Sequence, residues 1–217
     1  MKIYISPSSQ STNMYSGHNI SEAVVCRKIG EYLETALKRN GVTVKLADNN
    51  LTYKERVEDS NAWGSDYHVA IHTNAGGGKG TRLFCTESTS NLDITKAVFE
   101  SVSLLTPTYP DKIVENNALY EIKKTTMPCL YLEVEFHDNE NLAKWILDNE
   151  ENIAESICKG LVGNAYIGKH SINENTTNDL LYRVQVGTFK NKDNAERLVE
   201  QLSKLGFPCY ITTDLRG

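Results

Sequence analysis

The chain has 217 residues, of which 40% are hydrophobic and 24% charged, the composition of an ordinary globular protein. Its formal net charge of -5 and the lack of any basic block argue against nucleic acid as a partner. No apolar run approaches the roughly 20 residues that cross a bilayer, so membrane insertion is not expected.

The N-terminus, M-K-I-Y-I-S-P, leads directly into a strand and lacks the charged and apolar regions of a secretory signal. The sequence therefore predicts synthesis in the cytoplasm without a signal peptide. If such a protein acts outside the cell, it must be released by lysis or through a separate pore. The five cysteines are widely spaced and form no C-x-x-C pair, which indicates reduced, buried thiols.

Strand-like and helix-like segments alternate over residues 2–167. Strands are expected at 2–6, 42–46, 67–71, 80–85, 118–122 and 129–136, and helices at 21–40, 54–64, 91–105, 141–148 and 151–167. This order predicts an α/β fold in which a mostly parallel twisted sheet carries helices on both faces.

Residues 168–179 are polar and have the composition of a linker. Beyond them, a strand at 181–188, a helix from Asn191 to Gly206 and a strand at 209–212 predict a small β-α-β unit. Such a unit is short for an independent domain. We expect it to be the first half of a truncated repeat; a half-domain completed in a homodimer and a vestigial tail are the alternatives.

The segment 66–80, D-Y-H-V-A-I-H-T-N-A-G-G-G-K-G, is a short apolar run followed by a glycine-rich turn. A strand of this kind delivers His72 to its carboxyl end, the edge where open α/β sheets bind ligands. A neutral imidazole there is a good transition-metal ligand, and Asn74 with the glycines leaves room for a substrate. The alternative is a histidine with a hydrogen-bonded structural role.

Catalysis by zinc requires three protein ligands, one open position and a nearby carboxylate. Glu22 lies one residue after the expected start of the first helix and points toward the edge that carries His72. Glu133 lies inside the apolar strand C-L-Y-L-E-V-E-F, where a charge is unfavourable unless a cation compensates it. A salt-bridged core glutamate is the alternative interpretation of Glu133.

Several segments in order along residues 2–167 resemble the zinc-dependent N-acetylmuramoyl-L-alanine amidases of bacterial cell-wall enzymes and phage endolysins. They are Glu22, Arg56 with Asn61, A-I-H-T-N-A, G-x-G, Pro128 and L-E-V-E-F-H-D-N. The tail, Y-R-V-Q-V-G-T-F-K-N-K-D-N-A-E-R-L-V-E-Q-L, resembles the first half of a SPOR (sporulation-related) repeat. Repeats of that family bind peptidoglycan glycan strands that lack stem peptides. The resemblance implies a zinc amidase domain at 1–167, a linker at 168–179 and a partial SPOR-like domain at 180–217.

The resemblance implies hydrolysis of the amide between N-acetylmuramic acid and L-alanine by zinc-activated water. Glu22 and His72 would be the second and third metal ligands, and Glu133 the glutamate that moves protons. At the first ligand the chain departs from the family, which has a histidine there, and Gln10 takes its place; His18 in the same loop is the alternative. A glutamine oxygen is a weaker zinc ligand than an imidazole, so weaker metal retention is expected.

Four further residues are candidates for substrate binding or for support of the metal ligands: Asn74, Arg56, Glu135 and His137. Strand alternation would place Glu135 and His137 on the same face as Glu133, although strand-end residues in contact with solvent are an equally good interpretation. Two other functions remain open. One is a metal-deficient peptidoglycan-binding module, and the other is a zinc peptidase that acts on the stem peptide.

Overall fold

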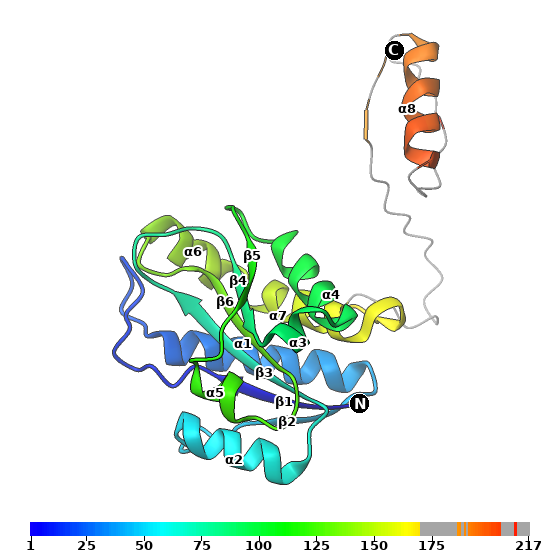
Figure 1. The fold of residues 1–217 in the computed structure, drawn as a ribbon. Coiled ribbons are helices and arrows are strands. Elements are labelled where there is room, and N and C mark those ends of the chain that lie inside the picture. The colour runs from blue at the N-terminus through cyan, green and yellow to red at the C-terminus, as the bar shows by residue number, and fades with distance from the viewer. Residues whose placement is uncertain (170–185, 188, 190, 205–210, 212–217) are drawn as a thin grey trace, which may run out of the picture. The chain divides into compact units, whose positions relative to one another are not determined.

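The computed structural model describes residues 1–169, 186–187, 189, 191–204 and 211 (Figure 1). The chain divides into two compact units, Met1–Ser171 and Ile172–Gly217. In the second unit helix α8 (Lys192–Lys204) occupies the region expected to be helical. Most of the residues in the two strands expected at 181–188 and 209–212 lie outside the described ranges.

The first unit is built on a six-stranded sheet with the strand order β2-β1-β3-β6-β4-β5. The strands are β1 (Lys2–Pro7), β2 (Thr43–Leu46), β3 (Tyr67–Asn74), β4 (Arg82–Cys85), β5 (Lys112–Glu115) and β6 (Cys129–Phe136). Neighbouring strands are parallel except for β4 and β6, which are antiparallel. The predicted α/β class and the mostly parallel sheet are therefore confirmed. Because β1, β3 and β6 are adjacent and parallel, their carboxyl ends meet at one edge.

Seven α-helices accompany the described part of the sheet. They are α1 (Glu22–Arg39), α2 (Tyr53–Trp63), α3 (Glu87–Ser90), α4 (Asp93–Ser103), α5 (Tyr120–Lys124), α6 (Glu140–Asp148) and α7 (Glu150–Val162), followed by a 3-10 turn at Gly163–Ala165. Thr52 begins α2 with a capping box, in which its hydroxyl accepts from the Glu55 amide and the Glu55 carboxylate accepts from Thr52.

One face of the sheet, here called the apolar face, carries the main hydrophobic core. Alternate strand residues such as Ile5, Ile71 and Leu132 pack there against residues of α1 and α7 such as Ile29 and Ile157. Helices α4 and α6 extend the same cluster through Val98, Val102, Ala143 and Ile146. Figure 1 shows α1, α4 and α7 gathered around this part of the unit. Successive side chains of a strand point to opposite faces of the sheet, and the apolar ones on this face form a continuous core.

The opposite face, here called the polar face, has a much smaller apolar cluster beneath α2 and α5. It is formed by Ala70, Ile122, Cys129 and Tyr131. Polar strand residues flank this cluster on the same face. Ser6 is the pairing partner of Ala70 on the neighbouring strand, and His72 is the pairing partner of Glu133. A row of polar side chains thus runs under α5 toward the carboxyl edge of β3.

The structure corrects one of the expected elements. Residues 118–122 were expected to form a strand, but helix α5 begins at Tyr120, and the strand of this region is β5. The turn between them is formed by Asn116, whose side-chain oxygen accepts from the Ala118 amide at 2.7 Å. The helix expected at 91–105 is present as α4, and a separate short helix, α3, which Thr86 caps, precedes it.

The expected alternation beyond Glu133 is wrong. The pairing of β3 with β6 shifts between His72 and Asn74, so β6 carries an extra residue there. Glu135 takes a positive φ of 55°, which is unusual for a residue other than glycine. A β-bulge of this kind redirects the side chains that follow it. Among the described residues, no helix is long and apolar enough to cross a membrane.

Candidate metal centre and active site

His72 lies at the carboxyl end of β3 and is 6% exposed. Its ring stacks on Tyr131 with centroids 4.4 Å apart and planes 15° apart. Its Nδ1 lies 2.8 Å from Glu22 Oε1, and its Nε2 lies 3.9 Å from Glu121 Oε2. Burial alone would lower the pKa of His72, but the Glu121 and Glu22 carboxylates outweigh it and raise the pKa to about 9. The imidazole is therefore placed between two carboxylates.

Glu22 is the first residue of α1 and reaches the same edge from the apolar face. It is 1% exposed, and its Oε2 accepts from Asn13 Nδ2 at 3.0 Å. Burial alone would raise the pKa of Glu22, but the hydrogen bonds from His72 and Asn13 lower it. Its backbone amide donates to the Asn13 carbonyl, so the loop after β1 is tied to the start of α1.

Gln10 lies in the same loop, with its Nε2 3.4 Å from His72 Nδ1. Its Oε1 accepts from Asn13 Nδ2 at 2.5 Å, so Asn13 joins Gln10 and Glu22. A half-turn of the amide would exchange the nitrogen that faces His72 for an oxygen. The alternative ligand, His18, makes no hydrogen bond or ion pair to Glu22 or His72 in the described part of the chain.

Glu133 is the sheet neighbour of His72 on β6. Its Oε2 is buried and has no hydrogen-bond partner among the described residues. Burial raises the pKa of Glu133 to about 7, the charge of His72 opposes this rise, and the charge of Glu22 adds to it. A salt-bridged core glutamate would form an ion pair, and the ion pairs of the neighbouring His72 run to Glu22 and Glu121 instead.

Glu121, on α5, was not predicted from the sequence. It is 5% exposed, and its Oε1 accepts from Ser6 Oγ at 2.6 Å and from His68 Nε2 at 3.1 Å. Burial would raise its pKa, but the hydrogen bonds and charges of His68 and His72 hold the pKa well below the usual range. Its only signal in the sequence is an acidic residue between the apolar Leu119 and Ile122, within the segment predicted to be a strand.

Arg56 and Asn74 flank the site. The Arg56 guanidinium is 3% exposed and donates to the carbonyls of Pro7 and Leu51, so it anchors the end of β1. This placement fits support of the Gln10 loop better than contact with a substrate. Asn74 is half-buried, its side-chain oxygen accepts from the Ala75 amide at 2.8 Å, and its backbone carbonyl accepts from the His137 amide.

Glu135 and His137 do not line a cleft, contrary to one expectation for them. Both oxygens of Glu135 are taken by Thr108, and Oε2 also accepts from the Gly80 amide, so the residue joins two loops. The His137 ring stacks on Tyr15 at 5.0 Å, and its Nδ1 lies 2.9 Å from Thr73 Oγ1. The bulge at Glu135 explains both corrections, because it ends the alternation on which the expectation was based.

The donor atoms of His72 and Glu22 fit a divalent cation, and the third donor beside them, the Gln10 amide, would be a weak ligand. Two buried carboxylates, Glu22 and Glu121, and the half-buried Glu133 surround one imidazole, an unfavourable accumulation of negative charge unless a cation balances it. No group of three His, Cys, Asp or Glu residues within the described ranges has the geometry to hold a metal ion. A third protein ligand beside His72 Nδ1 and Glu22 would therefore be of another type, and Gln10 is the neighbouring candidate.

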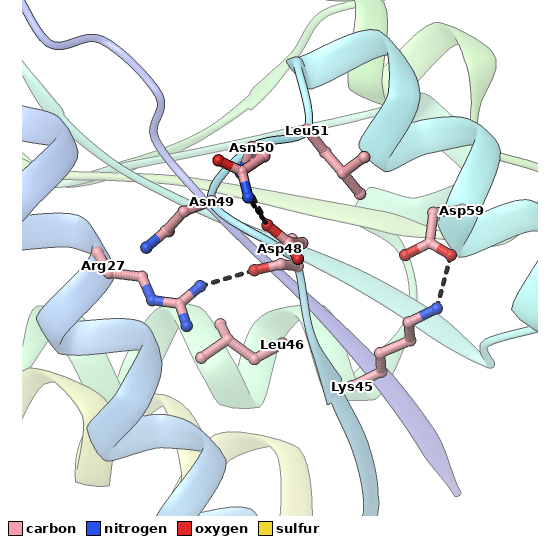
Figure 2. Close-up of a pocket in the computed structure, with 9 residues that line it drawn as sticks. Arg27, Lys45, Leu46, Asp48, Asn49, Asn50, Leu51 and Asp59 are labelled. Atoms are coloured by element: carbon pink, nitrogen blue, oxygen red, sulfur yellow. Dashed lines mark hydrogen bonds and ion pairs between the residues drawn. The ribbon is translucent and has the colours of Figure 1, made fainter.

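Two hollows lie near this edge of the sheet. One of about 260 Å³ opens beside the imidazole and is lined by Ser9, Gln10, Tyr53, His72, Leu119, Tyr120, Glu121 and Tyr131. A larger one of about 800 Å³ lies at the carboxyl end of β2. Figure 2 shows that its charged groups face one another, with Lys45 paired to Asp59 and Asn50 bonded to Asp48. It contains no histidine, so we place the chemistry at the smaller hollow.

Comparison with protein families identifies both parts of the chain. A family described as N-acetylmuramoyl-L-alanine amidase matches residues 7–162, and the SPOR domain family matches residues 164–216. Both resemblances predicted from the sequence are therefore confirmed. The SPOR match begins earlier than residue 180.

Two curated relatives are similar over most of the chain. The N-acetylmuramoyl-L-alanine amidase CwlM of Bacillus licheniformis is 27% identical over 170 residues, which are 77% of this chain and 64% of that protein. The chain thus spans less than two thirds of this relative's length. A sporulation-specific N-acetylmuramoyl-L-alanine amidase of Bacillus subtilis is 25% identical over 220 residues, with 97% of this chain and 84% of the relative covered.

Solved structures support the fold. The catalytic domain of the amidase CwlV from Bacillus (Paenibacillus) polymyxa has a TM-score of 0.67 at 22% identity and covers 74% of this chain and 95% of that one. The amidase AmiC2 of Nostoc punctiforme has a TM-score of 0.67 at 18% identity, with 75% and 95% covered. At these identities the likeness concerns the arrangement of the sheet and helices.

Proposed function

We propose, from the premise that the chain belongs to the N-acetylmuramoyl-L-alanine amidase family, that it hydrolyses the amide between N-acetylmuramic acid and L-alanine in peptidoglycan. The observation that carries the proposal is the convergence of three carboxylates from three elements on His72, of which Glu22 and Glu121 are buried and Glu133 is half-buried. A divalent cation, zinc by analogy with the family, would balance this charge. The ligands would be His72 through Nδ1, Glu22 and Gln10, with His18 as the alternative to Gln10.

Bound zinc would supply Lewis acidity, which polarises the lactyl carbonyl and acidifies water. The residues of the chain would supply the remaining functions. Glu133, with a pKa raised to about 7, can accept a proton from the attacking water and later donate one to the leaving amine of L-alanine. The bond between the lactyl carbon and the nitrogen breaks, and the products are a carboxylic acid and an amine. Asn74 and the hollow beside Tyr53 and Tyr120 are the candidates for holding the substrate next to this group.

The test uses the full chain on purified peptidoglycan, with zinc added after dialysis against chelator. Release of free amines that begin at L-alanine would support the proposal. New reducing ends would instead identify a glycosidase, and free D-alanine would identify a zinc peptidase acting on the stem peptide. Binding to peptidoglycan without any product, together with no metal by elemental analysis, would identify a metal-deficient binding module.

For the second unit we propose that it binds peptidoglycan glycan strands that lack stem peptides, and that a homodimer forms through it. The family match over residues 164–216 supports the glycan partner. An amidase produces such denuded glycan, so the two activities would act on the same region of the wall. The full chain should be retained on amidase-treated peptidoglycan more strongly than on intact peptidoglycan. Sedimentation equilibrium should give twice the chain mass; a monomer would refute the homodimer.

A further inference from the structure

Glu121 is a buried carboxylate for which the proposed reaction has no use. Its Oε1 accepts two hydrogen bonds, from Ser6 Oγ at 2.6 Å on β1 and from His68 Nε2 at 3.1 Å on β3. A carboxylate only accepts, so the proton of that second bond belongs to His68. Oε1 is thus held by two adjacent strands of the sheet. Oε2 makes neither of these bonds, and it lies 3.9 Å from Nε2 of His72.

The two nitrogens of His72 face different carboxylates. Nδ1 lies 2.8 Å from Glu22 Oε1 and 3.4 Å from Gln10 Nε2, which places it on the side of the expected ligands. Nε2 faces Glu121. An imidazole binds a metal through the nitrogen that carries no proton, and the hydrogen bond made by the other nitrogen decides which one that is.

Two neighbours together determine how the ring is presented. Tyr131 stacks on the imidazole with planes 15° apart, which fixes the plane of the ring but does not distinguish its nitrogens. Glu121 can distinguish them, because only the Nε2 side faces its free oxygen. The acid comes from a short helix, and its anchoring by Ser6 and His68 makes its position depend on the sheet.

We propose that Glu121 is a positioning residue that accepts the Nε2 proton of His72 and so leaves the Nδ1 lone pair for the metal. The inference rests on the proposed function, since it requires a metal. A distance of 3.9 Å is that of an ion pair, so the hydrogen bond needs an approach of about 1 Å. Burial of both groups makes the interaction stronger than it would be in water.

The test compares Glu121→Gln with Glu150→Gln in the full chain. Glu150 is a matched control because it is also 5% exposed and pairs with Lys28 on α1, away from His72. Zinc affinity is measured by competition with a chromophoric chelator. We expect Glu121→Gln to weaken zinc binding about 10- to 100-fold, as loss of an orienting carboxylate does, and Glu150→Gln to change it by less than about twofold. Equal affinities in Glu121→Gln and the wild type would overturn the inference.

A second measurement on the wild-type chain applies even if the variant does not fold. With cadmium-113 as the metal and nitrogen-15 in the histidines, coupling should appear at His72 Nδ1 while Nε2 carries a proton. Coupling at Nε2 would overturn the inference and leave the proposed function intact. A wild-type chain that binds neither zinc nor cadmium would refute the proposed function itself, and this inference with it.

Discussion

On β6, Leu132 and Glu133 are neighbours in the chain and lie on opposite faces of one sheet. Leu132 is fully buried among the residues of the apolar face. Glu133 lies beside His72 with a buried oxygen that lacks a partner in the described part of the chain. The apolar face contributes stability through packing, whereas the polar face keeps groups that folding alone would disfavour. The difference indicates that stability and chemistry are separated between the two sides of a single strand.

The largest effect should come from Glu133→Gln. If this carboxyl moves protons, the rate of amide cleavage should fall by about 10²- to 10⁴-fold. Thermal stability should be unchanged or slightly higher, since a carboxyl with one buried, unpartnered oxygen is replaced by a neutral group. Amine release from peptidoglycan and a melting curve measure the two quantities. A variant with the full rate would remove Glu133 from the reaction.

Leu132→Ala, at the residue next to Glu133, should lower stability and leave the rate unchanged. Loss of a fully buried leucine should lower the free energy of unfolding by about 2–5 kcal/mol. The rate per folded molecule should stay near that of the wild type. Urea unfolding followed by circular dichroism provides the measurement. Leu104→Ala is the control: this side chain is 87% exposed, and a change within about 0.5 kcal/mol is expected. A stable but inactive Leu132→Ala would contradict the separation of the two faces.

Metal retention should distinguish Gln10 from His18. Gln10→His should tighten zinc binding by about one order of magnitude or more, equivalent to at least about 1.4 kcal/mol, because an imidazole replaces an amide. His18→Ala should leave retention unchanged. Dialysis against graded chelator, followed by elemental analysis, compares the variants. Loss of zinc from His18→Ala with no effect of Gln10→Ala would make His18 the ligand.

The smallest effect is expected on α2, which covers the polar face. Thr52→Ala removes the capping hydroxyl that accepts from the Glu55 amide and should cost about 1 kcal/mol of stability with no change in rate. Thr35→Ala, at an exposed position inside α1, is the comparison and should be neutral or slightly stabilising. A rate change in Thr52→Ala would mean that α2 affects the reaction as well as the fold.

The amino-acid sequence by itself determined the alternating strands and helices. It also indicated that His72 and Glu133, at the strand edge, are candidates for the site. Both stand out because each interrupts or ends an apolar run, and such patterns depend on neighbours close in the chain. The match of the amidase family to residues 7–162 was foreseen from motifs of the same local kind. The position of Gln10 in the loop after β1 was likewise available from the order of the segments.

Only the tertiary structure decided how Glu121 and Asn13 enter the site. Glu121 is 49 positions from His72 in the numbering and lies on a helix whose five residues were too few to show a helical period. The bulge at Glu135 also left no local signal, and it ended the alternation that would have put Glu135 and His137 on the same face as Glu133. Contacts of this kind depend on strand pairing and helix packing, which bring together residues that the periodicity of one segment cannot relate.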